Sequence, residues 1–129
     1  ASQTQASQTI KSLTQEQAKV TVFSKIIIPP KLEKIQTNQN LRNLMLNQSK
    51  ITALPILEIQ SREVQARHGF STVRMDPQEI FYLQSRGLQK DQIKQILLQG
   101  FFAEIFEKLR PLCKKQDLEK KFDQFSFAF

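Results

Sequence analysis

The sequence predicts a mixed fold in which β-strands come first and α-helices follow. Two observations lead to this prediction. Residues 19–73 contain short runs of β-branched and other apolar residues, bounded by Pro and Asn, which are typical of strands. Residues 75–109 instead repeat apolar side chains at steps of three and four, which is typical of amphipathic helices. We therefore expect a β segment over residues 1–75 and a helical subdomain over residues 76–129.

The β segment contains several strand-like stretches. Residues 1–17 are polar and rich in Gln, Ser and Thr, a composition that is as compatible with disorder as with an ordered segment. After them come Lys19–Phe23, Lys25–Ile28, a buried path through Ile35, Leu41, Leu44 and Leu46, then Ile51–Ile59 and Glu63–Val73. Short strands with little glycine between them do not select one architecture, so a sandwich, a small barrel and a solenoid all stay open.

Two helices are predicted after the strands. Asp76 can accept hydrogen bonds from the first turn, Pro77 suits the first helical position, and Glu79 has capping-box spacing. Gly87 can adopt the left-handed conformation that ends the first helix, and Pro111 ends the second. The expected apolar stripe of the second helix consists of Ile93, Ile96, Leu97, Phe101, Ile105 and Leu109.

Three features of the helical part raise separate expectations. Gly100 inside a helix costs about 1 kcal/mol relative to Ala, which favours close packing of another backbone, with a kink as the alternative. Cys113, the only cysteine, excludes an internal disulfide and is expected to be a half-buried apolar residue. Leu118, Phe122 and Phe125 predict a short amphipathic helix, which packs on the helical subdomain or inserts into a partner.

Composition excludes several classes of function. The net charge of +7 is compatible with an acidic partner, but no recognition helix, RNA-binding aromatic signature or phosphate-binding loop accompanies it. One histidine and one cysteine cannot complete a metal site that needs about four ligands. No apolar run approaches the length of about 18 residues expected of a membrane span. No catalytic constellation is present, so we do not expect enzyme activity. For the reasons given above, we expect neither nucleic-acid binding nor membrane insertion.

Four sequence motifs carry a resemblance to a known family. They are FYLQSRG and LLQGFFAEIF in the helical part, and LPILEIQSREVQARHGFSTVRMD and IQTNQNLRNLML in the β segment. In this order they resemble the C-terminal region of the SufB/SufD family, subunits of an iron–sulfur cluster assembly complex. The resemblance covers roughly residues 19–109 and favours SufD over SufB. It also implies a larger N-terminal part, so that this chain is expected to be a C-terminal piece.

The resemblance selects among the open architectures. It implies C-terminal rungs of a right-handed parallel β-helix, followed by a small α-helical subdomain. Residues 1–17 are then expected to belong to the solenoid and not to be disordered. In a solenoid Asn38, Asn40 and Asn43 are expected at corners, because Asn tolerates a left-handed backbone.

The resemblance also implies a function and its partners. A SufD-like subunit pairs through its solenoid with a SufB-like scaffold or with a second copy, and its helical region docks the ATPase SufC. The subunit itself is a non-catalytic scaffold, and the expected location is the cytoplasm, a plastid or another organelle. The alternative is a truncated or degenerate homologue that acts only as a structural or protein-interaction module.

Two groups of site residues follow from the resemblance. His68 matches a SufD histidine that faces SufB, which implies a shared iron or iron–sulfur ligand; the alternative is a strand histidine that is hydrogen-bonded at the end of the solenoid. Relatives carry a cysteine where this chain has Ala66, so any role of that cysteine is lost. No cofactor is expected to bind tightly to this chain alone, although iron or a transient cluster is expected in the complex. The predicted partner-binding residues are Tyr82, Gln84, Arg86, Gln89, Lys90 and Gln99.

Overall fold

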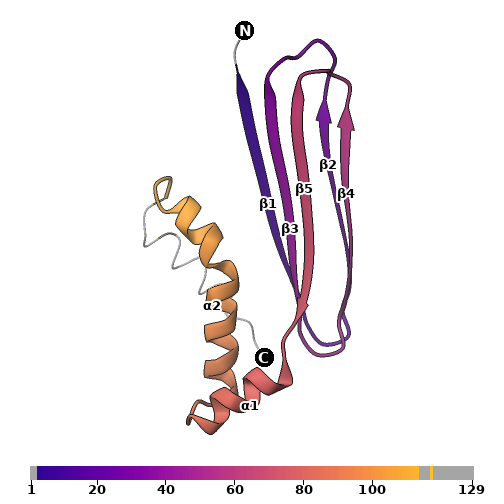
Figure 1. The fold of residues 1–129 in the computed structure, drawn as a ribbon. Coiled ribbons are helices and arrows are strands. Elements are labelled where there is room, and N and C mark those ends of the chain that lie inside the picture. The colour runs from indigo at the N-terminus through magenta and orange to yellow at the C-terminus, as the bar shows by residue number, and fades with distance from the viewer. Residues whose placement is uncertain (1–2, 114–116, 118–129) are drawn as a thin grey trace. The chain divides into compact units, whose positions relative to one another are not determined.

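The computed structural model describes residues 3–113 and 117. The chain forms two compact units, Ala1–Met75 and Asp76–Phe129. The described residues of the first unit form five β-strands, and those of the second form two α-helices (Figure 1). The predicted order, β followed by α, is confirmed.

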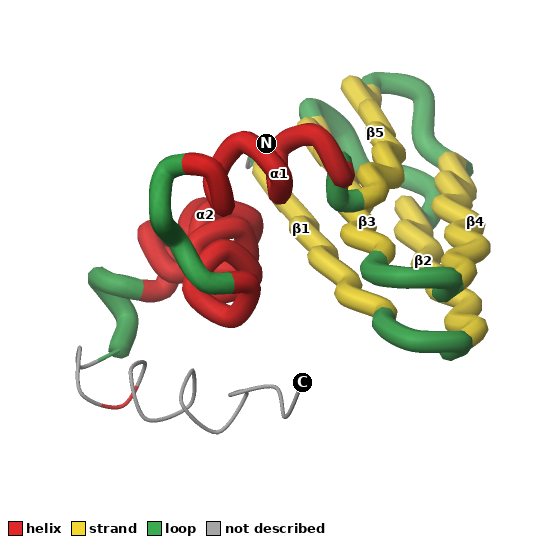
Figure 2. The backbone as a smooth tube through the Cα atoms, turned by 90° about the horizontal axis from the view of Figure 1, so that it is seen from below, coloured by secondary structure: helices red, strands yellow, loops and turns green. Residues whose placement is uncertain are grey.

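The five strands lie in two parallel sheets. The first sheet consists of β1 (Thr4–Thr14), β3 (Ile35–Met45) and β5 (Val64–Arg74), in that spatial order. The second consists of β2 (Lys19–Ile28) and β4 (Lys50–Ile59). Figure 2 shows the two sheets as separate layers, and the chain passes from one to the other at every connection. Residues 4–14, which by composition alone were equally compatible with disorder, are therefore a strand.

Equivalent positions recur in β1, β3 and β5 about every 30 residues, a repeat that the sequence alone did not reveal. Gln5 in β1 lies beside Gln36 in β3, 31 positions later, and Gln36 lies beside Gln65 in β5, 29 positions later. Alternate residues of a strand point to opposite faces of a sheet. Register partners in neighbouring parallel strands therefore share a face, and each face carries rows of equivalent positions.

The core of the first unit combines aliphatic and polar residues. The expected buried path through Ile35, Leu41, Leu44 and Leu46 is confirmed, and Ile28 joins it. The buried polar residues are Thr14, Ser24, Thr37, Gln39, Asn43 and Ser49. Because buried polar groups are costly unless they are hydrogen-bonded, the partners of these side chains determine how the strands fit together.

The expectation that three asparagines lie at corners is wrong. Asn38, Asn40 and Asn43 all lie within β3, and the buried Asn43 donates a hydrogen bond from Nδ2 to Oγ1 of Thr72 in β5, at 3.3 Å. Because an amide side chain can form a hydrogen bond with its register partner in the next strand, Asn is favourable at a buried strand position such as that of Asn43. Among residues 3–113, the non-glycine residues with positive φ are Glu16, Lys31, Lys34 and Asn47, which lie in the connections between strands.

The helix boundaries follow their local signals. Helix α1 (Pro77–Ser85) begins after Asp76, whose carboxylate accepts a hydrogen bond from the backbone N–H of Gln78 at 2.9 Å. Gly87 has a φ of 92°, as expected for a residue that ends α1. Helix α2 (Lys90–Leu109) ends before Pro111, as predicted. Neither helix of the described residues is long and apolar enough to cross a membrane.

Several expectations for the second helix are wrong. Ile96 is 48% exposed, whereas Ile93 and Leu98 are 1% and 2% exposed, so burial does not follow the predicted stripe. The exposed Ile96 lies between these two buried residues in the sequence, so one stripe at the helical period does not describe which side chains of α2 are covered. Among the described residues, a Cβ added at Gly100 would meet no heavy atom within 4 Å, so no other backbone packs closely there, and α2 continues through this position. Cys113 is exposed. The helix expected around Leu118, Phe122 and Phe125 lies outside the described residues.

Candidate functional site

His68 belongs to a row of polar residues on one face of the three-stranded sheet. Gln8 in β1 is the register partner of Gln39 in β3, and Gln39 is the register partner of His68 in β5. The Gln39 side chain reaches Ser24 in β2, which places this row on the face directed toward the two-stranded sheet. The internal repeat could have revealed this row, because residues 8, 39 and 68 are equivalent positions of it.

The centre of the row is a compact hydrogen-bond network. Gln39 donates from Nε2 to Oγ of Ser24 at 2.7 Å and to Oε1 of Gln8 at 3.0 Å. The Ser24 hydroxyl in turn donates to Oε1 of Gln8 at 2.9 Å. Gln39 is fully buried, yet its Oε1 has no hydrogen-bond partner within the part of the chain that the structure describes. An unpaired buried oxygen costs about 1–3 kcal/mol, so a donor at this position would stabilise the network.

His68 lies at the accessible end of the row. Its side chain is exposed, and exposure of the neighbouring row rises in the same direction, from 0% at Leu41 in β3 to 50% at Phe70 in β5. Arg67 is adjacent in sequence but lies on the opposite face, in the row of Asn38. The imidazole is thus reachable from outside while its row extends into the buried network.

The chemistry available at His68 is that of a single ligand. The described residues contain no group of three or more His, Cys, Asp or Glu side chains that could hold a metal ion. A neutral imidazole can offer one nitrogen to iron or another borderline metal. A complete site around His68 therefore requires ligands from another molecule.

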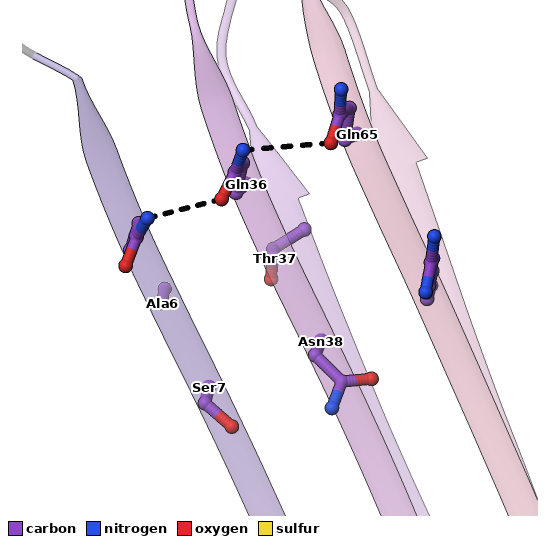
Figure 3. Close-up of a pocket in the computed structure, with 8 residues that line it drawn as sticks. Ala6, Ser7, Gln36, Thr37, Asn38 and Gln65 are labelled. Carbon is purple, nitrogen blue, oxygen red and sulfur yellow. Dashed lines mark hydrogen bonds between the residues drawn. The ribbon is translucent and has the colours of Figure 1, made fainter.

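The opposite face of the same sheet is lined with amide side chains. Gln5 donates to Gln36 at 3.0 Å, and Gln36 donates to Gln65 at 3.5 Å, as the dashed lines of Figure 3 show. Together with Asn38 and Arg67 they line a pocket of about 630 Å³. No predicted site residue lies in it. Its rows of amides bond to one another, which stabilises the stacking of the strands.

The outer face of the two-stranded sheet is apolar around one ion pair. Phe23 and Ile27 of β2 and Leu54 of β4 are large exposed hydrophobic residues. Between them Lys25 and Glu58 form an ion pair with a separation of 2.5 Å. The hydrogen bond from Lys25 lowers the pKa of Glu58, a second hydrogen bond from Gln60 lowers it further, and the positive charge of Lys25 acts in the same direction.

The predicted partner-binding residues of the helical unit are accessible to different degrees. Tyr82, Arg86, Gln89, Lys90 and Gln99 are exposed. Gln84 is half-buried. These residues occupy α1, α2 and the connection between the two helices.

Two of these residues are in contact. The Arg86 guanidinium lies 5.2 Å from the centre of the Tyr82 ring, a cation–π arrangement that holds both side chains on one surface. Gln89 acts locally, since its backbone N–H donates to Oε1 of Gln92 at the start of α2. Gln99 is not close to the others along α2, because nine residues separate it from Lys90, a rise of about 14 Å.

Two exposed apolar residues of this unit were missed. Phe81 is 73% exposed, and Ile96 is exposed although the helical period assigned it to the core. A pocket of about 450 Å³ lies beside Tyr82, and Leu83, Leu97, Asp76, Gln78 and Glu79 also line it. The sequence contains no signal that separates these residues from ordinary core positions, because exposure depends on which helix packs where.

Comparison with known families gives one match. The family described as "SUF system FeS cluster assembly, SufBD core domain" matches residues 1–101. The matched region includes all five strands, α1 and more than half of α2. It therefore extends across both units.

Individual curated proteins give the same result. The chain is 38% identical over 86 residues to an iron–sulfur cluster assembly SufBD family protein of Mycobacterium leprae, which covers 65% of the chain and 22% of that protein. It is 36% identical over 88 residues to the iron–sulfur cluster assembly protein SufD of Escherichia coli, covering 68% of the chain and 20% of that protein. It is 36% identical over 77 residues to the iron–sulfur cluster assembly protein SufD of Bacillus subtilis, which covers 59% of the chain and 18% of that protein. The chain spans about a fifth of the length of these relatives.

Proposed function

Since this chain belongs to the SufBD family of the SUF system for iron–sulfur cluster assembly, we propose that it acts as a SufD-like subunit of a SufBCD-type scaffold. In this proposal it pairs with a SufB-like subunit or a second copy and docks a SufC-like ATPase. It is a non-catalytic scaffold, and the partner ATPase hydrolyses ATP. Its location is the cytoplasm or the interior of an organelle.

The observation that carries the proposal is the extent of the family match, which includes the first unit and extends into the second as far as residue 101. We further propose that the strand unit forms C-terminal rungs of a right-handed parallel β-helix and the helical unit a separate domain. The alternation of successive strands between two parallel sheets, with 29 to 31 residues per turn, supports the first part of this proposal. The division of the chain at residue 75 supports the second.

His68 is proposed to contribute one ligand to iron or a nascent cluster, which is the cargo of the complex. Its exposure at the end of a buried polar row supports this role. The remaining ligands would come from the SufB-like partner, because the described part of this chain holds no group of three or more His, Cys, Asp or Glu side chains that could bind a metal ion.

The helical unit is proposed to bind the ATPase through Tyr82, Arg86 and their surroundings. Aromatic and Arg side chains dominate many interfaces when a rigid element presents them. The cation–π contact between these two residues supports the proposal, because it holds them in place before a partner arrives. Gln84, Gln89, Lys90 and Gln99 would contribute to the rim of this surface.

Co-expression with SufB and SufC tests the proposed function. The tagged chain should retain both partners through purification, in a fixed stoichiometry, and the complex should bind iron. A variant with Arg62→Glu, an exposed residue between β4 and β5, serves as a control for unspecific electrostatic capture. Loss of SufC under conditions in which SufB and SufC still associate with a full-length SufD would contradict the proposal.

A second function stays open, that of a structural or interaction module without a role in cluster assembly. The exposed hydrophobic residues Phe23, Ile27 and Leu54 on the outer face of the two-stranded sheet support this alternative, because exposed apolar patches commonly mark interaction surfaces. The two proposals differ in one measurement. An interaction module would bind SufB without recruiting SufC or iron, whereas a SufD-like subunit should recruit both.

A further inference from the structure

We propose that Gln39 is a positioning residue for His68: its buried carbonyl oxygen accepts a hydrogen bond from the imidazole and fixes the ring in one tautomer. Only the functional consequence of this inference rests on the proposed role of His68 as a ligand. The hydrogen bond itself is inferred from the register of β3 and β5 and from the unpartnered Oε1 of Gln39, and it can be tested without iron.

The Gln39 side chain is held in one orientation. Its Nε2 contacts the Ser24 hydroxyl at 2.7 Å and the Gln8 carbonyl oxygen at 3.0 Å, and the side chain is fully buried. The single proton of the Ser24 hydroxyl is already donated to Gln8. Reversing the Gln39 amide alone would bring two carbonyl oxygens to 3.0 Å, so, with Oε1 of Gln8 as the acceptor, the network determines which end of the Gln39 amide is oxygen.

In this orientation Oε1 of Gln39 can accept a hydrogen bond from a residue of β5, the strand on the other side of β3. Both partners of Nε2 come from β1 and β2, the strands that precede β3. Among the described residues Oε1 has no partner, although it is buried. The residue beside Gln39 on the other side is His68, its register partner in β5.

The imidazole of His68 can supply the missing donor. Neighbouring strands lie about 4.8 Å apart, and register partners share a face, so a ring N–H of His68 is within reach of Oε1. The His68 side chain is exposed, so it can rotate toward Gln39 without displacing a packed group. The bond would satisfy a buried oxygen whose isolation costs about 1–3 kcal/mol.

The consequence is a histidine prepared for ligation. When one ring nitrogen donates to a fixed acceptor, the other is unprotonated and directed away from it. Histidine ligands of metals are commonly oriented in this way by an outer hydrogen bond, and removing that partner lowers metal affinity about 10- to 100-fold. Gln39 would thus act on a ligand without touching the metal.

Nitrogen-15 NMR of the metal-free chain tests the inference. The chain has one histidine, so a sample labelled with ¹⁵N-histidine reports a single imidazole. The spectrum is recorded at a pH of about 8.5, about two units above the pKa of an imidazole in model peptides. We expect one tautomer, with a ring N–H that exchanges slowly with water. A rapidly exchanging mixture of both tautomers in the unchanged chain would overturn the proposal, whatever the variants do.

Two matched variants separate positioning from general stability. Gln39→Met keeps the length of the side chain but removes the acceptor, and should produce the mixture of tautomers. Gln36→Met makes the same change in the same strand on the opposite face and should leave the His68 spectrum unchanged. A single tautomer that persists in a folded Gln39→Met variant would overturn the inference.

The failure of this inference and the failure of the proposed function are distinguishable. If His68 has one tautomer but its removal leaves iron binding intact, the positioning stands and the ligand role fails. If removal of His68 lowers iron binding while the free chain shows both tautomers, the ligand role stands and the positioning fails.

Discussion

Ser49 shows how a single hydroxyl group determines a corner of the strand unit. Its side chain is fully buried, accepts a hydrogen bond from the Thr14 hydroxyl at 2.9 Å, and lies within bonding distance of the Leu46 and Thr14 carbonyl oxygens, at 2.8 and 3.1 Å. It therefore joins the end of β1 to the connection between β3 and β4. The Arg74 guanidinium donates to the backbone oxygen of Ser49 at 3.4 Å, which adds β5 to the same corner.

Replacing Ser49 should destabilise the chain. Ser49→Ala leaves the Thr14 hydroxyl and a buried carbonyl without this partner, so we expect the free energy of unfolding to fall by about 1–3 kcal/mol. Urea unfolding followed by circular dichroism measures the change. Ser71→Ala, at an exposed position of β5, should stay within about 0.5 kcal/mol of the unchanged chain. Equal effects of the two substitutions would contradict the assigned role of the corner.

His68 is the residue on which the proposed chemistry depends. His68→Ala in a reconstituted complex should lower the iron bound per complex, because it removes the one imidazole that this chain can offer. Subunit stoichiometry and the ATPase activity of SufC should stay near normal, since the His68 side chain is exposed on the edge strand β5. Gln65→Ala, in β5 but on the other face, is the control. Full iron loading of the His68 variant would return this residue to the structural alternative.

At the scale of elements, α1 and its connection to α2 carry the proposed docking surface. Charge reversal at Arg86 combined with Tyr82→Ala removes both members of the cation–π pair. Both side chains are exposed, so the fold should be preserved. We expect SufC to bind at least about tenfold more weakly, a loss of about 1.4 kcal/mol.

Calorimetry of SufC binding measures this effect, and circular dichroism establishes that the variant is folded. Arg67→Glu, an exposed charge reversal in the strand unit, controls for the change in net charge. If a folded double variant binds SufC with unchanged affinity while the control does the same, this surface is not the docking site.

At the scale of the whole molecule, the strand unit predicts self-association. β5 is an edge strand of its sheet, and its Phe70 and Val73 are 50% and 55% exposed. Unpaired strand edges with apolar side chains favour pairing with another chain. Light scattering at several concentrations should show a mass that rises with concentration. A monomer at every concentration would contradict this expectation.

A charge at the strand edge should reduce that association. Phe70→Glu places a carboxylate among the apolar side chains of β5 and should shift the distribution toward the monomer. Phe81→Glu makes the same substitution at the phenylalanine of α1, which is 73% exposed. If Phe81→Glu has the larger effect, the helical unit and not the sheet edge mediates association.

The sequence alone determined the features that depend on near neighbours. The order of strands and helices follows from periodicity, and the bounds of the helices follow from Asp76, Gly87 and Pro111. A cap or a helix stop acts within one turn of its own residue. The family motifs are equally local, and the family they indicated is confirmed.

Tertiary structure decided what depends on residues far apart in the chain. Asn43 is a strand residue because Thr72, 29 positions later, accepts its hydrogen bond. Leu98 is buried and Ile96 is exposed, a difference that the periodicity of α2 does not specify. Gln39 matters to His68 only through a register that places them side by side. Local patterns cannot specify such contacts, because the free energy of each contact depends on which strand or helix the whole fold places next to the residue.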